Sequence, residues 1–475
     1  MPPQRLFDPG LRGLSTSTMT VIAVAAYNNL SVGAALPAIG DDLGNLDLLP
    51  WVVTVELITS AIAVLAVGPV IDGIGTRRIY RVSLVAFAIT CVACAAAPTM
   101  AALVAARAAQ GLAGGVIIAN VMAAIGLGVP EPLRARAYAI NSSVWGVMGL
   151  AGPALAALIL TVGSWPAIFL VNLPVAVGAA IVGWNNFPGP VDEAEVDADW
   201  RGLTLLTIFT CLTLVGFSVP GVWTLIAVIG SVVLIGGYVV HERRTEPPVL
   251  RVRHLTSPEF RLLHLTAVFA IISGIGSNSF LTLYVKGVRG FSTSAAAFTV
   301  LFLTVGWTLG AYVSSKVVER RTSEFSVRVG SIVLVVGVTG AALVVVFDLP
   351  VALVFAAYTV VGYGLGAVSS SGVIVLQAKA RPAEMGRLMS AHQFIRTLGF
   401  SYGAAVAGAA LFGVVASRLG DADAVRDLLG DEVDVVGAAT VDALRDGFAL
   451  ATVVAALFGW IAMGFALRLR DPGAA

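Results

Sequence analysis

The segment Gly68-Pro-Val-Ile-Asp72-Gly-Ile-Gly75-Thr-Arg77-Arg78 decides the fold, because it is a short polar turn between two long apolar runs. The runs cover residues 50–71 and 79–97, and each approaches the length of about 20 residues that a helix needs to cross a bilayer. The glycines of the segment permit a tight turn and close helix packing. Its acid can accept hydrogen bonds from a helix N-terminus, and its arginines can form ion pairs.

The composition extends this interpretation to the whole chain. Of its 475 residues, 58% are hydrophobic and 12% are charged, and the mean hydropathy is +0.92. Intrinsic disorder is excluded, because it needs low hydrophobicity and a high net charge. So few charges could not cover the surface of a soluble enzyme, since soluble proteins carry about 25% charged residues. The net charge of +1 gives no basic field for nucleic acid.

Apolar runs of membrane-spanning length recur along the chain. They are continuous rather than alternating, which predicts helices and not a β-barrel. We predict fourteen of them, at residues 16–40, 50–71, 79–97, 101–128, 138–161, 167–185, 202–219, 222–240, 262–285, 295–316, 328–347, 351–376, 389–416 and 447–467.

The lysines and arginines orient these spans. With the N-terminus in the cytoplasm, 22 of the 29 basic residues fall in cytoplasmic segments and five fall outside. The remaining two, Arg107 and Arg396, lie within spans. By the positive-inside rule we expect a multi-pass protein of the cell membrane with both termini in the cytoplasm.

Cysteine and histidine give no sign of a metal or redox centre. Cys91, Cys94 and Cys211 all lie in apolar runs, and the four histidines are scattered. We interpret the cysteines as small apolar fillers and expect neither a metal site nor a cofactor.

The 68–78 segment resembles the cytoplasmic loop motif of the major facilitator superfamily. In that family the loop latches the outward-open state, so the resemblance implies a cytoplasmic gate. Gly73 and Thr76 stand where arginines are usual, which predicts a weaker latch. The alternative is an ordinary basic turn. The implied gate residues are Gly68, Asp72, Gly75, Arg77 and Arg78.

Two further strings make the resemblance more specific. Gly146-Val-Met-Gly149-Leu-Ala-Gly152-Pro153 in the fifth span resembles the antiporter signature, which marks exporters within the superfamily and in which glycines allow close packing and proline kinks the helix. Its motif residues are Gly149, Gly152 and Pro153. The second string, Ser164–Pro174, resembles one branch, the fourteen-span drug/proton antiporters, although Pro166 sits where an arginine is common.

This resemblance implies an all-α integral membrane protein with two six-helix bundles and two inserted spans, fourteen transmembrane helices in all. The implied parts are a cytoplasmic N-terminus (1–15), an N-terminal bundle (16–185), an acidic cytoplasmic linker (186–201), an inserted helix pair (202–240), a basic linker (241–261), a C-terminal bundle (262–467) with an extracellular acidic loop (417–446), and a cytoplasmic tail (468–475).

An arginine within the fourth span is the first candidate for chemistry. A charge inside a span is costly and faces the protein interior or a water-filled cavity. The family places an arginine here, followed by a glutamine, as Arg107 and Gln110 are in this chain, and associates it with proton coupling. The alternative is an arginine that only bonds helix-end carbonyls.

The most consequential departure from the branch is at Asn28. The branch normally has an aspartate there, and asparagine cannot titrate. An acid appears instead at Glu56 in the second span, about 9 Å below the outer boundary by helix rise. A carboxyl removed from water binds a proton more readily, so we predict that Glu56 has taken over proton binding. The alternatives are a Glu56 that reaches water and has no special role, and loss of proton coupling.

In the two-bundle arrangement, polar and aromatic residues would line a largely apolar central cavity suited to lipophilic substrates. We list as substrate-cavity candidates Asn28, Asn141, Trp145, Asn278, Trp307, Tyr358 and Tyr363.

Together these patterns predict a secondary transporter rather than an enzyme. It would export lipophilic or amphipathic small molecules by alternating access and proton antiport. The sequence has no G-x-x-x-x-G-K-[ST] string, which argues against an ATP-driven pump. The alternatives are a dedicated lipid or secondary-metabolite exporter and an uncoupled facilitator. We expect a monomer whose partners are substrate, protons and membrane lipid.

Overall fold

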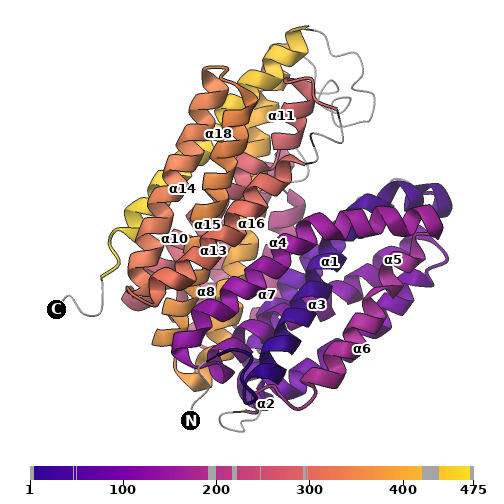
Figure 1. Ribbon diagram of the computed structural model, residues 1–475, viewed down its shortest axis with the longest axis vertical. Helices are drawn as coiled ribbons and strands as arrows, with labels where there is room; N and C mark the ends of the chain where they lie inside the picture. Colours follow the sequence, from indigo (N-terminus) through magenta and orange to yellow (C-terminus); the bar gives the residue numbers. More distant parts are fainter. Residues whose placement is uncertain are drawn as a thin grey trace. The chain divides into compact units, whose positions relative to one another are not determined.

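The described part of the chain is helical throughout. The computed structural model describes residues 5–45, 48–49, 51–190, 199–216, 222–246, 248–292, 296, 298–419 and 438–470 (Figure 1). Eleven helices in these residues are long and apolar enough to cross a membrane. The chain is therefore a multi-pass membrane protein, whereas the count of fourteen spans stays a prediction. Several predicted features lie partly outside the described residues: the N-terminus 1–15, the spans 50–71, 202–219 and 295–316, the acidic linker 186–201, the basic linker 241–261, the loop 417–446 and the tail 468–475.

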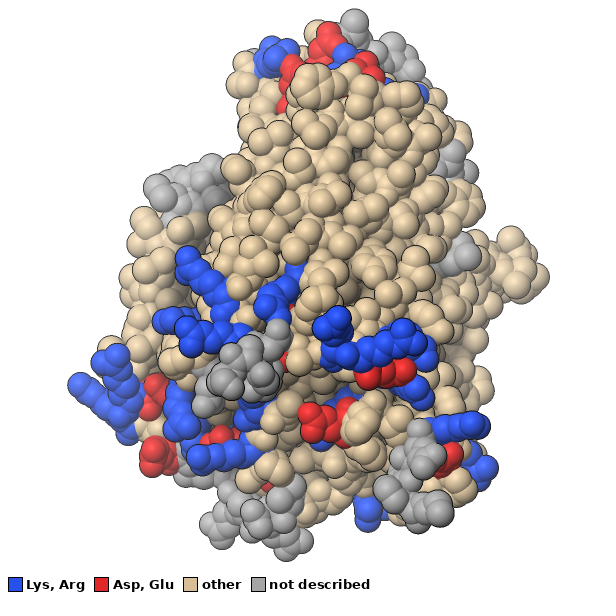
Figure 2. Space-filling view, turned by 60° about the vertical axis from the view of Figure 1, so that its left-hand side comes forward, with Lys and Arg blue, Asp and Glu red and all other residues tan. Residues whose placement is uncertain are grey.

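The surface carries its charges in separate zones. Figure 2 shows acidic and basic side chains gathered toward the lower part and the top of one face, with a broad uncharged area between them. Large apolar side chains are exposed along the helices, among them Val162 at 82% and Ile181 at 78%. Lipid tails can cover such a surface, whereas exposing it to water would be unfavourable.

The chain divides into two compact units, of which unit 1 comprises Met1–Phe260 and Leu376–Phe394. The most extensive helix pairs within unit 1 are α2 with α3, α1 with α4, and α7 with α8. Its helices are α1 (Arg12–Leu43), α2 (Trp51–Ala95), α3 (Met100–Gly128), α4 (Glu131–Val162), α5 (Pro166–Leu170), α6 (Asn172–Gly183), α7 (Trp200–Gly216), α8 (Val222–Glu242), α9 (Val252–Thr256) and the short 3-10 helix η2 (Pro382–Glu384).

Helix α2 is broken where the sequence predicts a turn. Its 45 residues would span about 68 Å as one helix, more than twice the hydrocarbon core of about 30 Å. Gly75 breaks it, with φ 81° and ψ 157°. A side chain at Gly75 would also collide with the backbone of Pro190, so both the conformation and the space require glycine.

Unit 2 comprises Arg261–Val375 and Ile395–Ala475. Its tightest contact is reciprocal: Gly306 and Gly310 of α13 lie against the backbone of α15, and Gly362 and Gly366 of α15 lie against the backbone of α13. The helices of unit 2 are α10 (Pro258–Asn278), α11 (Leu281–Gly287), α13 (Thr299–Val318), α14 (Ser323–Val346), most of α15 (Val351–Lys379), most of α16 (Met385–Leu419) and α18 (Ala438–Ala466). Residues 376–394, at the adjoining ends of α15 and α16, belong to unit 1.

Candidate functional site

Two glycines of α3 set the geometry around the first candidate site. A methyl group at Gly111 would collide with the backbone carbonyl of Glu56, and one at Gly115 would collide with that of Ser60. The four-residue spacing puts both glycines on one face of α3, so α2 and α3 lie backbone to backbone. This close contact brings Glu56 of α2 beside Arg107, one turn before Gly111.

Arg107 is 1% exposed, and backbone and neutral side-chain oxygens satisfy most of its guanidinium. Its Nε donates to the Val52 carbonyl at 2.9 Å, and its Nη1 donates to Gln110 Oε1 at 2.6 Å. Nη1 also lies 3.4 Å from Asn28 Oδ1. Arg107 is thus anchored to α1, α2 and α3 without any carboxylate.

Glu56 is the one carboxyl side chain of this group. It is 2% exposed, and its Oε2 lies 3.7 Å from Arg107 Nη2. The interpretation that Glu56 reaches water is therefore wrong in this conformation. At 3.7 Å the ion pair is looser than the three bonds that Arg107 makes to neutral oxygens. Glu56 can consequently gain or lose a proton without removing the other anchors of Arg107.

Two cysteines belong to the same group, which the sequence interpretation as apolar fillers missed. Gln110 Nε2 donates to Cys91 Sγ at 3.2 Å, and Cys94 Sγ donates to Gln110 Oε1 at 3.5 Å. Both thiols are buried and free. The only signal was helical spacing, since Cys91 and Cys94 lie three residues apart and therefore on one face of α2. We call Asn28, Glu56, Cys91, Cys94, Arg107 and Gln110 the Arg107 cluster.

A second candidate site lies at the break of α2. The Asp72 carboxylate accepts from the backbone N–H of Gly386 at 2.5 Å and of Arg387 at 3.1 Å, and it lies 3.3 Å from Arg387 Nη1. Gly386 and Arg387 belong to the first turn of α16, whose N–H groups have no partner within the helix. We call these three residues the Asp72 latch. Gly68 packs closely against the start of α16, since a methyl group at Gly68 would press on Arg387 and Ser390.

The basic end of the motif makes different contacts from those expected. Arg77 Nε donates to the Phe187 carbonyl at 2.8 Å. Thr76 and the Arg77 backbone both donate to the Pro188 carbonyl. Among the described residues, the segment after α6 therefore meets this end of the motif through carbonyl oxygens. Arg78 is exposed. The expected weakening at Thr76 is offset in part, since its hydroxyl binds the segment that packs on Gly75.

A third contact near the Asp72 latch was missed from the sequence. Gln377, near the end of α15, is 2% exposed. Its Nε2 lies 2.9 Å from the Met122 carbonyl and 2.6 Å from the Tyr138 hydroxyl. These three residues all belong to unit 1. A single glutamine at a helix end gives no pattern that could have indicated this contact.

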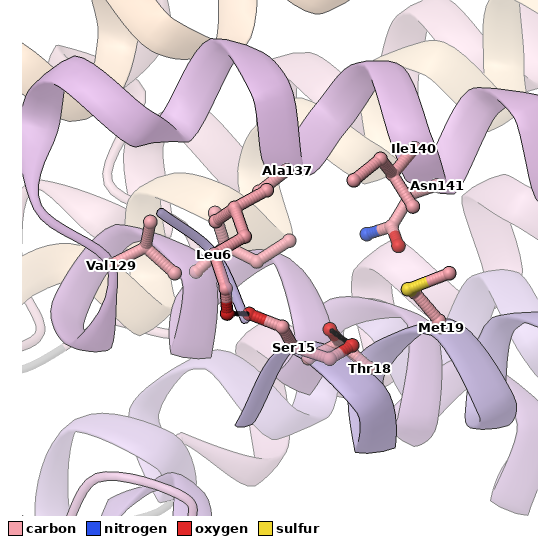
Figure 3. A pocket seen from close by; sticks show the side chains of 9 residues that line it. Leu6, Ser15, Thr18, Met19, Val129, Ala137, Ile140 and Asn141 are labelled. Carbon is pink, nitrogen blue, oxygen red and sulfur yellow. Dashed lines mark hydrogen bonds between the residues drawn. The ribbon is translucent and has the colours of Figure 1, made fainter. Parts of the chain in front are cut away.

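The predicted cavity residues are scattered among different environments. In unit 1, Asn141 lines a small cavity with Ser15 and Thr18, which Figure 3 shows with Ile140 and Met19 around it. Its volume of about 10 Å³ is near the minimum for one water molecule. Trp145 lies one turn further along α4 and is half-buried.

The candidates in unit 2 differ in exposure. Tyr358 is fully buried in the core and donates to the Ser277 carbonyl at 2.5 Å, so it is a packing residue in this conformation. Trp307 stacks on Phe400 with ring centroids 6.5 Å apart. Asn278 and Tyr363 are half-buried.

The antiporter string lies in α4, which packs against α1. Gly152 is buried, and a methyl group there would lie 3.5 Å from Leu30 Cβ, an ordinary contact. Gly149 and Pro153 are half-buried in the same helix. Gly152 is therefore less constrained by packing than Gly111 and Gly115 are.

Comparison with known proteins finds a matching family model, relatives of similar sequence and a solved structure with the same fold. The family model described as Major Facilitator Superfamily matches residues 18–404. The chain is 25% identical over 407 residues to the multidrug transporter protein MdtP of Bacillus subtilis, covering 84% of this chain and 75% of that protein. It is 27% identical over 425 residues to the tetracenomycin C resistance and export protein of Streptomyces glaucescens, covering 87% and 78%. The crystal structure of the human organic anion transporter MFSD10 has the same fold, with a TM-score of 0.68 at 14% identity over 97% of this chain and 100% of that one.

Proposed function

Since the chain belongs to the Major Facilitator Superfamily, we propose that it exports lipophilic or amphipathic small molecules across the cell membrane in exchange for protons. Relatives named for multidrug transport and for antibiotic export support a drug-type substrate. The observation that carries the proton part is Glu56, a buried carboxyl beside an arginine that is already anchored by neutral oxygens.

The proposal includes fourteen spans with both termini in the cytoplasm. The break at Gly75 supports counting α2 as two crossings, which turns eleven long helices into twelve. Helices α7 and α8, which pack on each other, would be the inserted pair. The excess of lysine and arginine in the predicted cytoplasmic segments supports the orientation. Lipid contact and a monomeric state complete the proposal.

Proton exchange would use the Arg107 cluster as a two-state element. With Glu56 ionised, its carboxylate attracts Arg107 across 3.7 Å. With Glu56 protonated this attraction is lost, while Val52, Gln110 and Asn28 still hold the guanidinium. Proton uptake thus changes the force between α2 and α3 without leaving Arg107 unpaired. Alternating access needs such a change, because a ligand shifts an equilibrium only through different affinity for its states.

Transport in reconstituted vesicles tests the proposal. Vesicles with an imposed pH gradient are supplied with the dyes ethidium and rhodamine 6G, and dye movement and proton flux are recorded. We expect wild type to couple the two fluxes. Glu56→Gln should lose gradient-driven transport by tenfold or more, yet keep dye exchange at equal pH. The matched control is Glu324→Gln, which removes a buried carboxyl at 5% exposure from α14. Unchanged coupled transport in Glu56→Gln would refute the role of Glu56.

The same assay separates the second candidate function, export of one dedicated secondary metabolite. The tetracenomycin C export relative favours this alternative. A dedicated exporter would move neither dye, but its own substrate would drive proton flux when added, and tetracenomycin C is the first substrate to test. An uncoupled facilitator would move dye without proton flux.

A further inference from the structure

The start of α16 carries an acid that the Asp72 latch does not use. Glu384 ends η2 and directly precedes Met385, the first residue of α16. It lies two residues before Gly386, whose N–H binds Asp72. Two carboxylates therefore share one helix N-terminus, and the charge of Glu384 repels that of Asp72.

Two residues of the linker after α8 hold Glu384. Arg251 Nη1 lies 3.0 Å from Glu384 Oε1, and His254 Nε2 lies 3.6 Å from Glu384 Oε2. The His254 side chain is only 5% exposed, whereas the Arg251 and Glu384 side chains are 32% and 26% exposed. Arg251 compensates the carboxylate charge, and the buried imidazole fixes where the carboxylate lies.

The linker is itself anchored to α7 and α8. Tyr238 of α8 donates to the Leu250 carbonyl at 2.6 Å and accepts from the Leu250 N–H at 2.8 Å. Asp199, at the start of α7, accepts from the Val249 N–H of the linker at 3.5 Å and lies 2.8 Å from His241 Nε2 of α8. Arg251 immediately follows Leu250, so the linker presents it from a fixed point.

We propose that Arg251 and His254 are positioning residues of the Asp72 latch, and that they act through Glu384 to connect the α7–α8 pair to the start of α16. By holding and neutralising Glu384, the linker keeps the first turn of α16 in register with Asp72. Helices α7 and α8 then stabilise the closed cytoplasmic gate. This inference rests on the proposed alternating access, in which the Asp72 latch would close the cytoplasmic gate that the loop resemblance implies.

Cysteine accessibility tests the inference without substrate or proton gradient. The reporter is Met389→Cys in a Cys211→Ser background, because Met389 is fully buried behind the latch. Inside-out vesicles are treated with a maleimide, and the labelling rate is measured. We expect Arg251→Ala to raise the rate roughly fivefold, as for loss of a partly exposed ion pair. Arg251→Lys keeps the charge and should stay within about twofold of the parent.

The matched control is Arg253→Ala, which removes an equal charge from an exposed position in the same linker. It should leave the labelling rate unchanged. The buried Cys91 and Cys94 report on folding in every variant and should stay unlabelled. A parental rate in Arg251→Ala would overturn the inference, as would equal effects of Arg251→Ala and Arg253→Ala, or labelling of Cys91 and Cys94 together with the reporter.

Asp72→Asn in the same assay separates the two proposals. If it raises the labelling rate and Arg251→Ala does not, the latch closes the gate but the linker does not support it, and this inference fails alone. If Asp72→Asn leaves the rate unchanged, the gate role of the Asp72 latch fails, and the inference fails with it.

Discussion

Removing Arg107 should damage the protein far more than neutralising Glu56, although the two form one ion pair. Arg107→Gln leaves a carboxylate at 2% exposure with no cation beside it. Glu56→Gln leaves Arg107 with its bonds to Val52, Gln110 and Asn28. The asymmetry follows because the arginine has several acceptors and the acid has one cation.

The expected magnitudes follow from these contacts. Breaking a buried pair by removing one partner costs about 3–5 kcal/mol, mostly from the uncompensated charge. Neutralising Glu56 should cost at most about 1 kcal/mol, because an amide of the same shape remains. In the double variant no buried charge is left unpaired, so we expect it to recover about 2 kcal/mol of the Arg107→Gln loss. Acidification should also rescue Arg107→Gln alone, since a protonated Glu56 needs no cation.

Thermal inactivation measures these differences. Large membrane proteins usually unfold irreversibly, so the half-life of the monodisperse, detergent-solubilised protein at fixed temperature is the relevant quantity. We expect Arg107→Gln to shorten it by about 100- to 5,000-fold and Glu56→Gln by less than about fivefold, with the double variant between them. Equal losses in the two single variants, or additive losses in the double variant, would refute the reasoning.

Three further outcomes are expected. Gly115→Ala should separate α2 from α3 at Ser60 and cost about 1–3 kcal/mol, visible as a shorter thermal half-life. Asp72→Asn should lose the pair with Arg387 and about 2 kcal/mol of latch stability, visible as faster maleimide labelling of the Met389→Cys reporter. Burial lowers the pKa of His254, opposed by Glu384, so the unfolded chain binds this proton more readily and acidification below about pH 6.5 destabilises the fold. The melting temperature of His254→Phe should therefore fall less than that of wild type between about pH 7.5 and pH 5.5.

The sequence predicts the helical class and the turn at Gly75 because each depends on local pattern. Long apolar runs must be helices in lipid, and a glycine-rich string between two of them must turn. The number of spans is a weaker prediction, since it depends on short helices such as α7, with 17 residues. Length alone does not decide whether such a helix crosses.

The site could be predicted from the sequence only where a residue type is energetically unfavourable in its surroundings. Arg107 and Glu56 stand out because a charge within a span needs a partner. Their pairing does not follow from the sequence, since it depends on how closely α3 approaches α2. That approach is set by Gly111 and Gly115, which are indistinguishable by type from Gly152, where a methyl group would fit.

The contacts of Gln377 and Glu384 show what local patterns omit altogether. Gln377 binds Met122 and Tyr138, which lie more than 200 residues earlier in the sequence. Glu384 binds Arg251, which lies 133 residues earlier. No periodicity links such distant positions, so only the folded chain reveals them. A latch made of one acid and one helix N-terminus is recognisable as a motif. The residues that brace the latch do not belong to that motif, because any cation presented from the linker could compensate Glu384.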